Sequence, residues 1–186
     1  MSASAVDVLV VGAGVMGCAT ALELARRGLG VCVLERSVPG AEASSAAAGM
    51  LGAQAEAHGP GPLLDLSLAS RARMAEWASR LHEVTGIDVE YRRSGILRVA
   101  HDGPQLAGLR ARVAWQQAAG LDATELDGAE ARAREPALAD TVVGAAHFAS
   151  DGRIDPPRSL AALRIAAARL GARFQSGALV RRIAVE

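Results

Sequence analysis

The first part of the chain contains two apolar runs, and a glycine-rich turn and a helical pattern lie between them. Its parts are an apolar run (8–11), a glycine turn (12–17), a helical pattern (about 15–27) and a second apolar run (31–34) that ends in Glu35. This order predicts a strand, a crossover helix and a parallel strand. The chain is therefore limited to an α/β fold with a Rossmann-like start.

Each glycine of the turn has a separate physical task. Gly12 permits the tight passage from strand to helix, and Gly14 lets the backbone approach a pyrophosphate closely. Gly17 lets the helix pack tightly on the strand. The free N–H groups at the start of the helix favour phosphate oxygens, so the turn predicts a dinucleotide site.

Glu35 stands at the end of the second apolar run. A carboxylate at this place can accept hydrogen bonds from both ribose hydroxyls of an adenosine. It would repel a 2′-phosphate, which disfavours NADP. The residues alone leave FAD and NAD open.

Composition excludes several classes of partner. The chain has 186 residues, 51% of them hydrophobic, and a formal net charge of +0, so neither nucleic acid nor an anionic membrane is indicated. No apolar stretch reaches the length of a membrane span, and we expect no signal peptide and a cytoplasmic location. The four histidines lack the spacing of metal ligands, so no metal site is expected.

The remaining sequence predicts an alternation of helices and short strands. We expect helices at 63–84, 104–119, 128–135 (capped by Asp127) and 156–170, and strands at 89–91, 95–100, 142–148, 172–175 and 179–185. Residues 1–88 and 151–186 are expected to form one doubly wound FAD-binding domain. Residues 89–150 are expected to form part of a second, β-rich substrate domain inserted into it. Asp151 and Asp155 are expected to act in turns and helix caps.

Small residues dominate the segment Ser44–Glu56, which reads SSAAAGMLGAQAE. Such a segment would let the backbone approach a large flat ligand, and Ser44 and Ser45 could donate to phosphate or ribitol oxygens. A plain helix start rich in Ala explains the composition equally well.

Together, the glycine turn, Glu35 and the segment 44–56 resemble the start of the D-amino-acid oxidase family of flavoenzymes. Within that family the AAAGMLGA stretch is most similar to the bacterial glycine oxidase branch, which serves thiamine synthesis. The similarity continues at 81–88, 94–97, Glu135-Pro136 and 151–157.

The resemblance implies FAD as the cofactor and a set of residues that contact it. The pyrophosphate would face Gly12, Gly14, Val15, Met16 and Gly17; the adenosine would face Glu35, Arg36 and Val180; the phosphate and ribitol would face Ser44 and Ser45; the isoalloxazine would face Ala48, Gly49 and Met50. Glu42 and Ala43 stand where this family often places Arg or Thr, which is expected to weaken that side of the site.

The resemblance also implies the reaction. The amine of glycine or a related small amino acid would be oxidised to the imine and keto acid, with oxygen as the acceptor and ammonia and hydrogen peroxide as products. A sarcosine oxidase or a D-amino-acid dehydrogenase of the same family is an alternative. So are a non-catalytic fragment and, less favoured, an NAD-dependent dehydrogenase.

The family's substrate-binding Arg and Tyr lie in a second half that this sequence does not match. Tyr91, Arg92 and Arg93 do not stand at those positions, so we nominate no catalytic residue. The sequence is interpreted as the N-terminal portion of a longer protein, whose full-length form could be a homo-oligomer. We expect the chain alone to bind FAD weakly or not at all, and to be unstable unless a partner covers its exposed sheet edge.

Overall fold

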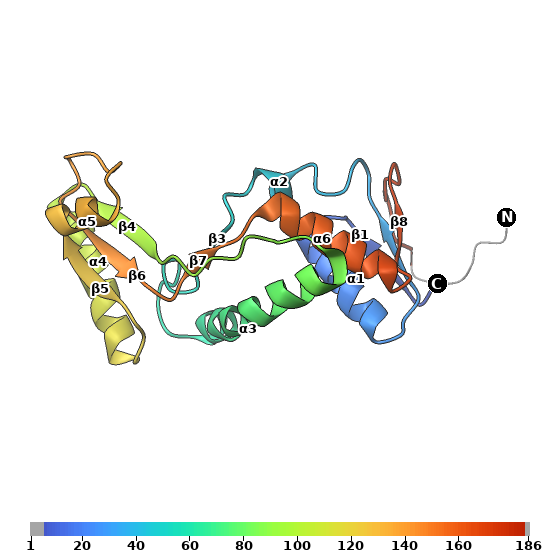
Figure 1. The fold of residues 1–186 in the computed structure, drawn as a ribbon, viewed down its shortest axis with the longest axis horizontal. Coiled ribbons are helices and arrows are strands. Elements are labelled where there is room, and N and C mark those ends of the chain that lie inside the picture. The colour runs from blue at the N-terminus through green and yellow to red at the C-terminus, as the bar shows by residue number, and fades with distance from the viewer. Residues whose placement is uncertain (1–5, 185–186) are drawn as a thin grey trace. The chain divides into compact units, whose positions relative to one another are not determined.

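The computed structural model describes residues 6–184 of the chain (Figure 1). Its elements in chain order are β1 (Val8–Val11), α1 (Val15–Arg26), β2 (Val31–Leu34), α2 (Ala43–Ala46), β3 (Met50–Leu51), α3 (Pro62–Thr85), β4 (Ile96–Ala100), α4 (Gly103–Ala118), β5 (Thr124–Asp127), α5 (Gly128–Arg134), β6 (Gly144–Phe148), β7 (Gly152–Arg153), α6 (Pro156–Arg169) and β8 (Arg173–Gln175).

The chain divides into two compact units. The first comprises Met1–Gly49, Glu76–Glu90 and Ile154–Glu186, and the second comprises Met50–Ala75 and Tyr91–Arg153. Each unit is described by itself. The domain boundaries expected from the sequence stay a prediction.

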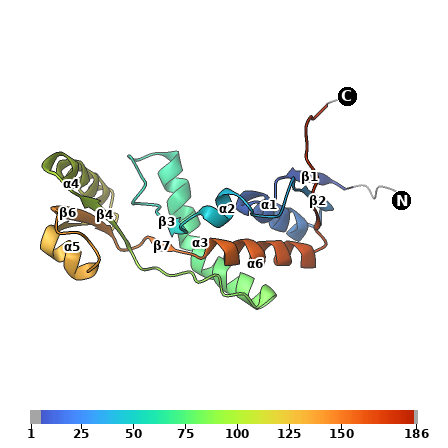
Figure 2. The ribbon, with the colours of Figure 1, turned by 90° about the horizontal axis from the view of Figure 1, so that it is seen from above.

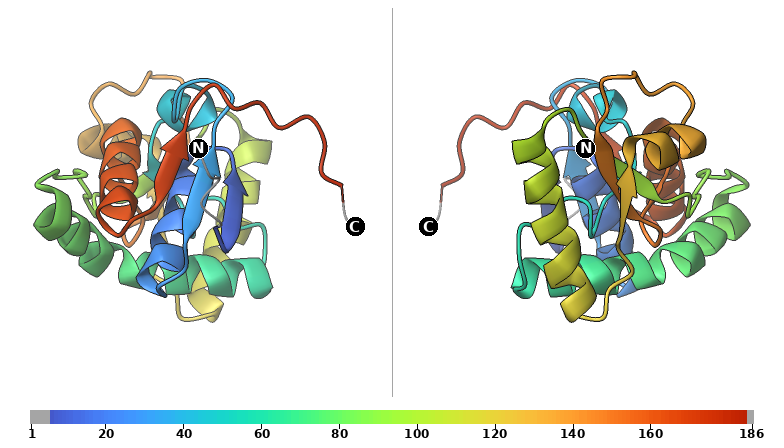
Figure 3. Two further views of the ribbon diagram at one scale, coloured as in Figure 1. Left: turned by 90° about the vertical axis from the view of Figure 1, so that its right-hand side faces the viewer. Right: turned by 90° about the vertical axis from the view of Figure 1, so that its left-hand side faces the viewer.

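The first unit contains a three-stranded parallel sheet in the order β1-β2-β8. Helices α1 and α6 pack against each other and lie on the same face of this sheet (Figure 3). Val31 and Val33 of β2 are buried. Successive side chains of a strand point to opposite faces, and on β1 Leu9 and Val11 are 58% and 59% exposed. The predicted βαβ start is confirmed.

Helix α1 buries one stripe of small and branched side chains. Cys18, Ala21, Leu22 and Ala25 are its buried residues, and their spacing is that of one helical face. At Gly17 a Cβ atom would lie 1.9 Å from the carbonyl oxygen of Gly12. Only glycine permits this approach of the helix to the turn before it.

The second unit contains an antiparallel sheet in the order β4-β6-β5. Ala146 and Phe148 of β6 pack with Leu109 and Val113 of α4, whereas Ala145 packs with Leu126 and Ala131 of β5 and α5. Neighbouring residues of β6 thus face opposite sides, and α4 and α5 cover the two faces of the sheet (Figure 2).

Two strands expected from the sequence are not found. Residues 89–91 form no strand, because Glu90 has a φ of +54°, which interrupts an extended backbone; only a single bridge joins Arg92 to Arg153. Residues 179–184 form none either, since no neighbouring strand pairs with them in the described part of the chain, and Val185 lies outside it.

Three strands of the second unit were not expected, namely β5 and the two-residue strands β3 and β7, which pair with each other. β5 has the sequence Thr-Glu-Leu-Asp, in which only Leu126 is buried. Its polar composition hides it from a hydrophobic pattern, and it forms because it pairs with β6. The helices at 62–85, 103–118, 128–134 and 156–169 are confirmed within one or two residues at each end.

Candidate cofactor site

The glycine turn joins β1 to α1 and leaves the start of the helix accessible. Gly12 has a φ of +97°, in the left-handed region that favours glycine. Gly14 is the N-cap of α1 and contributes no side-chain hydrogen bond. The first turn of α1 therefore presents backbone N–H groups, together with the positive end of the helix dipole, to an anion.

Two side chains from later in the chain bind this turn. The backbone N–H of Ala13 donates to Glu35 Oε2 at 2.8 Å, and that of Val15 donates to Ser44 Oγ at 3.0 Å. Both contacts join the glycine turn to residues that the sequence nominates for the same ligand.

Glu35 is held in its charged form. The N–H groups of Ala13 and Ser37 donate to its two carboxylate oxygens, at 2.8 and 2.9 Å. These hydrogen bonds, the one from Ala13 first, lower the pKa of Glu35 below its ordinary value of 4.5. An ionised carboxylate at the end of β2 can accept hydrogen bonds from ribose hydroxyls.

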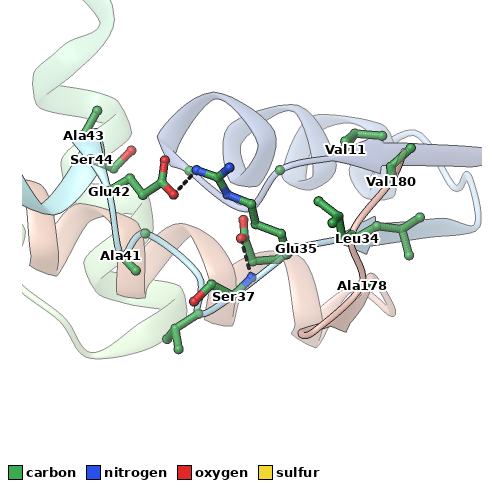
Figure 4. Close-up of a pocket in the computed structure, with 16 residues that line it drawn as sticks. Val11, Leu34, Glu35, Ser37, Ala41, Glu42, Ala43, Ser44, Ala178 and Val180 are labelled. Atoms are coloured by element: carbon green, nitrogen blue, oxygen red, sulfur yellow. Dashed lines mark hydrogen bonds and ion pairs between the residues drawn. The ribbon is translucent and has the colours of Figure 1, made fainter. Parts of the chain in front are cut away.

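A cavity of about 430 Å³ opens at the carboxyl ends of β1 and β2 (Figure 4). This is the place where open parallel sheets bind their ligands. The nominated residues that line it are Gly12, Gly14, Glu35, Arg36, Ser44 and Val180. The cavity therefore brings together residues from both ends of the first unit.

Other nominated residues do not line this cavity. Val15 and Met16 lie exposed in the first turn of α1, and Gly17 packs against Gly12. Ser45 donates to the carbonyl oxygen of Glu42 at 3.1 Å, so its hydroxyl is used within its own turn.

The residues nominated for the flavin ring, Ala48, Gly49 and Met50, do not line the 430 Å³ cavity either. Ala48 is exposed, and Gly49 has a φ of +79° and accepts a hydrogen bond from the N–H of Ile154 at 2.9 Å. A Cβ atom on Gly49 would meet the Ile154 carbonyl oxygen at 2.0 Å, so a glycine is required there. Met50 is 60% exposed.

Arg36 and Glu42 form an ion pair at the wall of the same cavity (Figure 4). The Glu42 carboxylate raises the pKa of the Arg36 guanidinium above its ordinary value. Both side chains are more than half exposed. Glu42 thus places a negative charge beside this cavity and neutralises the positive charge of Arg36.

A second cavity, of about 870 Å³, lies in the second unit. It is lined by the end of β3, residues 52–53 and 56–61, the first half of α3 and Arg98 of β4. The sequence interpretation missed it, although the run Gly-Pro-Gly-Pro at 59–62 marks the turn on its wall.

The structure also bears on metals and membranes. Among residues 6–184 there is no group of three or more His, Cys, Asp or Glu side chains that could hold a metal ion. No helix in this described range combines the length and apolar character that a membrane span requires.

Comparison with known proteins identifies one family. The family described as FAD dependent oxidoreductase matches residues 7–186. The chain is 39% identical over 180 residues to the bifunctional protein ThiO/ThiG of Synechocystis sp., covering 96% of this chain and 26% of that protein. It is 40% identical over 167 residues to a glycine oxidase of Geobacillus kaustophilus, covering 89% and 44%.

Solved structures of glycine oxidases are similar to this chain in fold as well. The crystal structure of the Geobacillus kaustophilus glycine oxidase superposes with a TM-score of 0.89 at 39% identity, covering 92% of this chain and 46% of that one. The Bacillus cereus glycine oxidase also gives a TM-score of 0.89, at 34% identity and with coverages of 98% and 49%. The expected α/β fold is confirmed, and the chain spans less than half the length of these relatives.

Proposed function

Because this chain belongs to the family of FAD dependent oxidoreductases, we propose that the cavity at the ends of β1 and β2 holds the adenosine diphosphate part of FAD. One observation carries the proposal: the cavity is lined by the glycine turn, Glu35 and Val180 together. These supply anion-binding N–H groups, a ribose acceptor and a backbone position for the adenine.

Each group of nominated residues would contact a different part of FAD. Gly12, Gly14, Val15, Met16 and Gly17 form or support the pyrophosphate turn; Glu35 and Arg36 take the ribose and adenine side with Val180; Ser44 and Ser45 serve the phosphate and ribitol; Ala48, Gly49 and Met50 approach the isoalloxazine. The contact between Ser44 Oγ and the Val15 N–H supports the placement of Ser44 beside the phosphates.

For the longer protein we propose oxidation of the amine of glycine or a related small amino acid, in the service of thiazole synthesis. The similarity to glycine oxidases and to ThiO/ThiG proteins supports this choice. Bound FAD would supply the hydride acceptor, and this chain would bind and orient it. Oxygen as final acceptor and a cytoplasmic location stay predictions.

An equilibrium titration tests the cofactor proposal. FAD is added to the purified chain and the quenching of flavin fluorescence is followed, so that weak binding is also detected. We expect saturable, equimolar binding that ADP competes away, with little flavin retained after removal of the unbound excess. NAD⁺ should not compete.

Two results would argue against the proposal. Absence of a saturable signal would remove the FAD site from this chain. Binding of NAD⁺ in preference to FAD would favour the alternative dehydrogenase. A Glu35→Gln variant serves as the control, because it removes the charge of the ribose acceptor while keeping a side chain of the same size.

A further inference from the structure

A buried carboxylate in the second unit binds a turn nearly one hundred residues earlier in the chain. Asp151 is fully buried, and its oxygens accept hydrogen bonds from the backbone N–H groups of Gln54 at 3.0 and 3.2 Å and Ala55 at 2.8 Å. The guanidinium of Arg71 pairs with Asp151 Oδ1 at 2.7 Å. The carboxylate charge is therefore neutralised by Arg71, and both of its oxygens accept hydrogen bonds.

The residues that Asp151 binds belong to a single helical turn, 52–57, which is closed by the hydrogen bond from the Glu56 N–H to the Gly52 carbonyl oxygen at 3.0 Å. Two arginine side chains bind the opposite, carbonyl end of this turn. Arg98 and Arg112 both donate to the carbonyl oxygen of Ala55 at 2.9 Å.

This arrangement complements the turn electrostatically. A negative charge lies at its N–H end and positive charges at its carbonyl end, which is the favourable orientation for a helical dipole. Because Arg98 and Arg112 donate to the same oxygen, two like charges lie together at this carbonyl end, and burial together with Arg98 lowers the pKa of Arg112. Their hydrogen bonds to the turn offset that repulsion.

The side chain of Gln54 completes the network. It is fully buried, and its amide donates to Gln116 Oε1 and to the Asp122 carbonyl oxygen, both at 2.9 Å. Its oxygen accepts from Arg71 at 2.6 Å. Within the described residues no buried side-chain nitrogen or oxygen lacks a partner. Such a satisfied network favours one conformation of the turn.

The turn forms a wall of the 870 Å³ cavity, which Gly52, Ala53, Glu56 and Ala57 line together with Arg71 and Arg98. We infer that Asp151 is a positioning residue that fixes the turn 52–57 and so the shape of this cavity. Since β3 (Met50–Leu51) runs directly into the turn, Asp151 also sets the place of Met50. The placement of Met50 beside the isoalloxazine ring rests on the proposed function, whereas the role of Asp151 in the turn does not.

Hydrogen exchange measured by mass spectrometry tests this inference on the full chain. In Asp151→Asn, one carboxylate oxygen becomes an amide group that cannot accept a hydrogen bond. We expect the amides of peptide 50–57 to exchange at least about tenfold faster, as loss of a charge-assisted hydrogen bond predicts. Peptides of β1, α1 and α6 should exchange as in the wild type.

The matched control is Asp102→Asn. Asp102 caps α4 by accepting the Gln105 N–H at 2.8 Å, so this variant also removes a capping carboxylate from the second unit. It should leave the exchange of peptide 50–57 unchanged. A second test variant, Arg98→Gln combined with Arg112→Gln, loosens the carbonyl end of the turn without burying an unpaired charge. It should accelerate the same peptide, and it decides the matter if Asp151→Asn does not fold.

A spectroscopic measurement separates positioning from general loss of structure. With saturating FAD, Asp151→Asn should shift the visible flavin band while the affinity for ADP stays within about twofold of the wild type, because ADP contacts only the first unit. Unchanged exchange of peptide 50–57 in either test variant would overturn the inference. So would acceleration spread equally over both units. If the wild type binds no FAD, the proposed function fails, and the exchange data alone still decide the role of Asp151.

Discussion

The backbone N–H of Ala13 donates to the carboxylate of Glu35 at 2.8 Å, so the acid at the end of β2 is bonded directly to the glycine turn after β1. This contact joins the two parts of the dinucleotide signature. It orients the second carboxylate oxygen toward Ser37 and holds the group ionised beside the cavity.

Replacement of Glu35 by Gln should weaken adenosine binding. The neutral amide keeps one acceptor oxygen but loses the charge, and a hydrogen bond to a charged group contributes more than a neutral one, so we expect about a tenfold loss of ADP affinity. Isothermal titration calorimetry of ADP measures it. Unchanged affinity would place the ribose away from Glu35.

The same substitution should alter the dependence of stability on pH. The folded state lowers the pKa of Glu35, so its contribution is fully present above the ordinary value of 4.5 and is lost as the pH falls through the lower folded pKa. Urea unfolding at neutral and acid pH measures this. The free energy of unfolding should fall less steeply with acid in Glu35→Gln than in the wild type.

Gly17→Ala should disrupt the packing of α1. The added Cβ would lie 1.9 Å from the Gly12 carbonyl oxygen, and the backbone of both elements must move apart. We expect a loss of about 2–3 kcal/mol in the free energy of unfolding, as overpacking typically causes. Chemical denaturation followed by circular dichroism measures it.

Gly108→Ala is the matched control for that prediction. Gly108 lies within α4 and its Cβ would meet nothing within 4 Å. Alanine there should stabilise the chain by about 0.5–1 kcal/mol through helix propensity. Equal effects of the two substitutions would refute the proposed tight approach at Gly17.

Ser44→Ala should reduce ADP affinity more than Ser45→Ala. The Ser44 hydroxyl bonds the Val15 N–H at the start of α1, where the phosphates are proposed to bind, and it could donate to a phosphate oxygen. One such hydrogen bond contributes about 1 kcal/mol, or roughly fivefold in affinity. Ser45 already donates to the Glu42 carbonyl oxygen. A larger loss in Ser45→Ala would reverse these assignments.

Glu42→Gln should increase ADP affinity. Removing this carboxylate takes a negative charge from the cavity wall and leaves the positive charge of Arg36 there without its partner, which favours an anionic ligand. We expect an increase of about three- to tenfold at low ionic strength, which fades near 1 M salt because exposed charges are then screened. Stability should change by less than about 1 kcal/mol, since exposed ion pairs contribute little. An affinity that falls, or a gain that salt does not affect, contradicts the proposal.

Features that depend on neighbouring residues could be predicted from the sequence. The glycine turn with its flanking strands and the capped helices after Asp127 and Asp155 are confirmed, because their signals act over three or four residues. Asp127 forms a capping box with Glu130, and Asp155 accepts the Arg158 N–H at 2.8 Å. The family, recognised from short motifs, is likewise confirmed.

Asp151 shows where such local interpretation ends. The expectation of a turn or cap role was correct in kind, since its carboxylate accepts backbone N–H groups, but those groups belong to Gln54 and Ala55. Nothing in the neighbouring sequence indicates a partner so far away. The same holds for β5, whose polar sequence becomes a strand only beside β6.

The sequence by itself determined the βαβ start, the helices and the membership of the family, because backbone conformation and burial period are set by residues close in the chain. Tertiary structure alone decided that Ser44 accepts the Val15 N–H and that Glu42 forms an ion pair with Arg36. It also decided that Asp151 accepts hydrogen bonds from the turn 52–57. Buried polar groups must find hydrogen-bond partners wherever the folded chain brings them. Those partners exist only once distant segments have packed together.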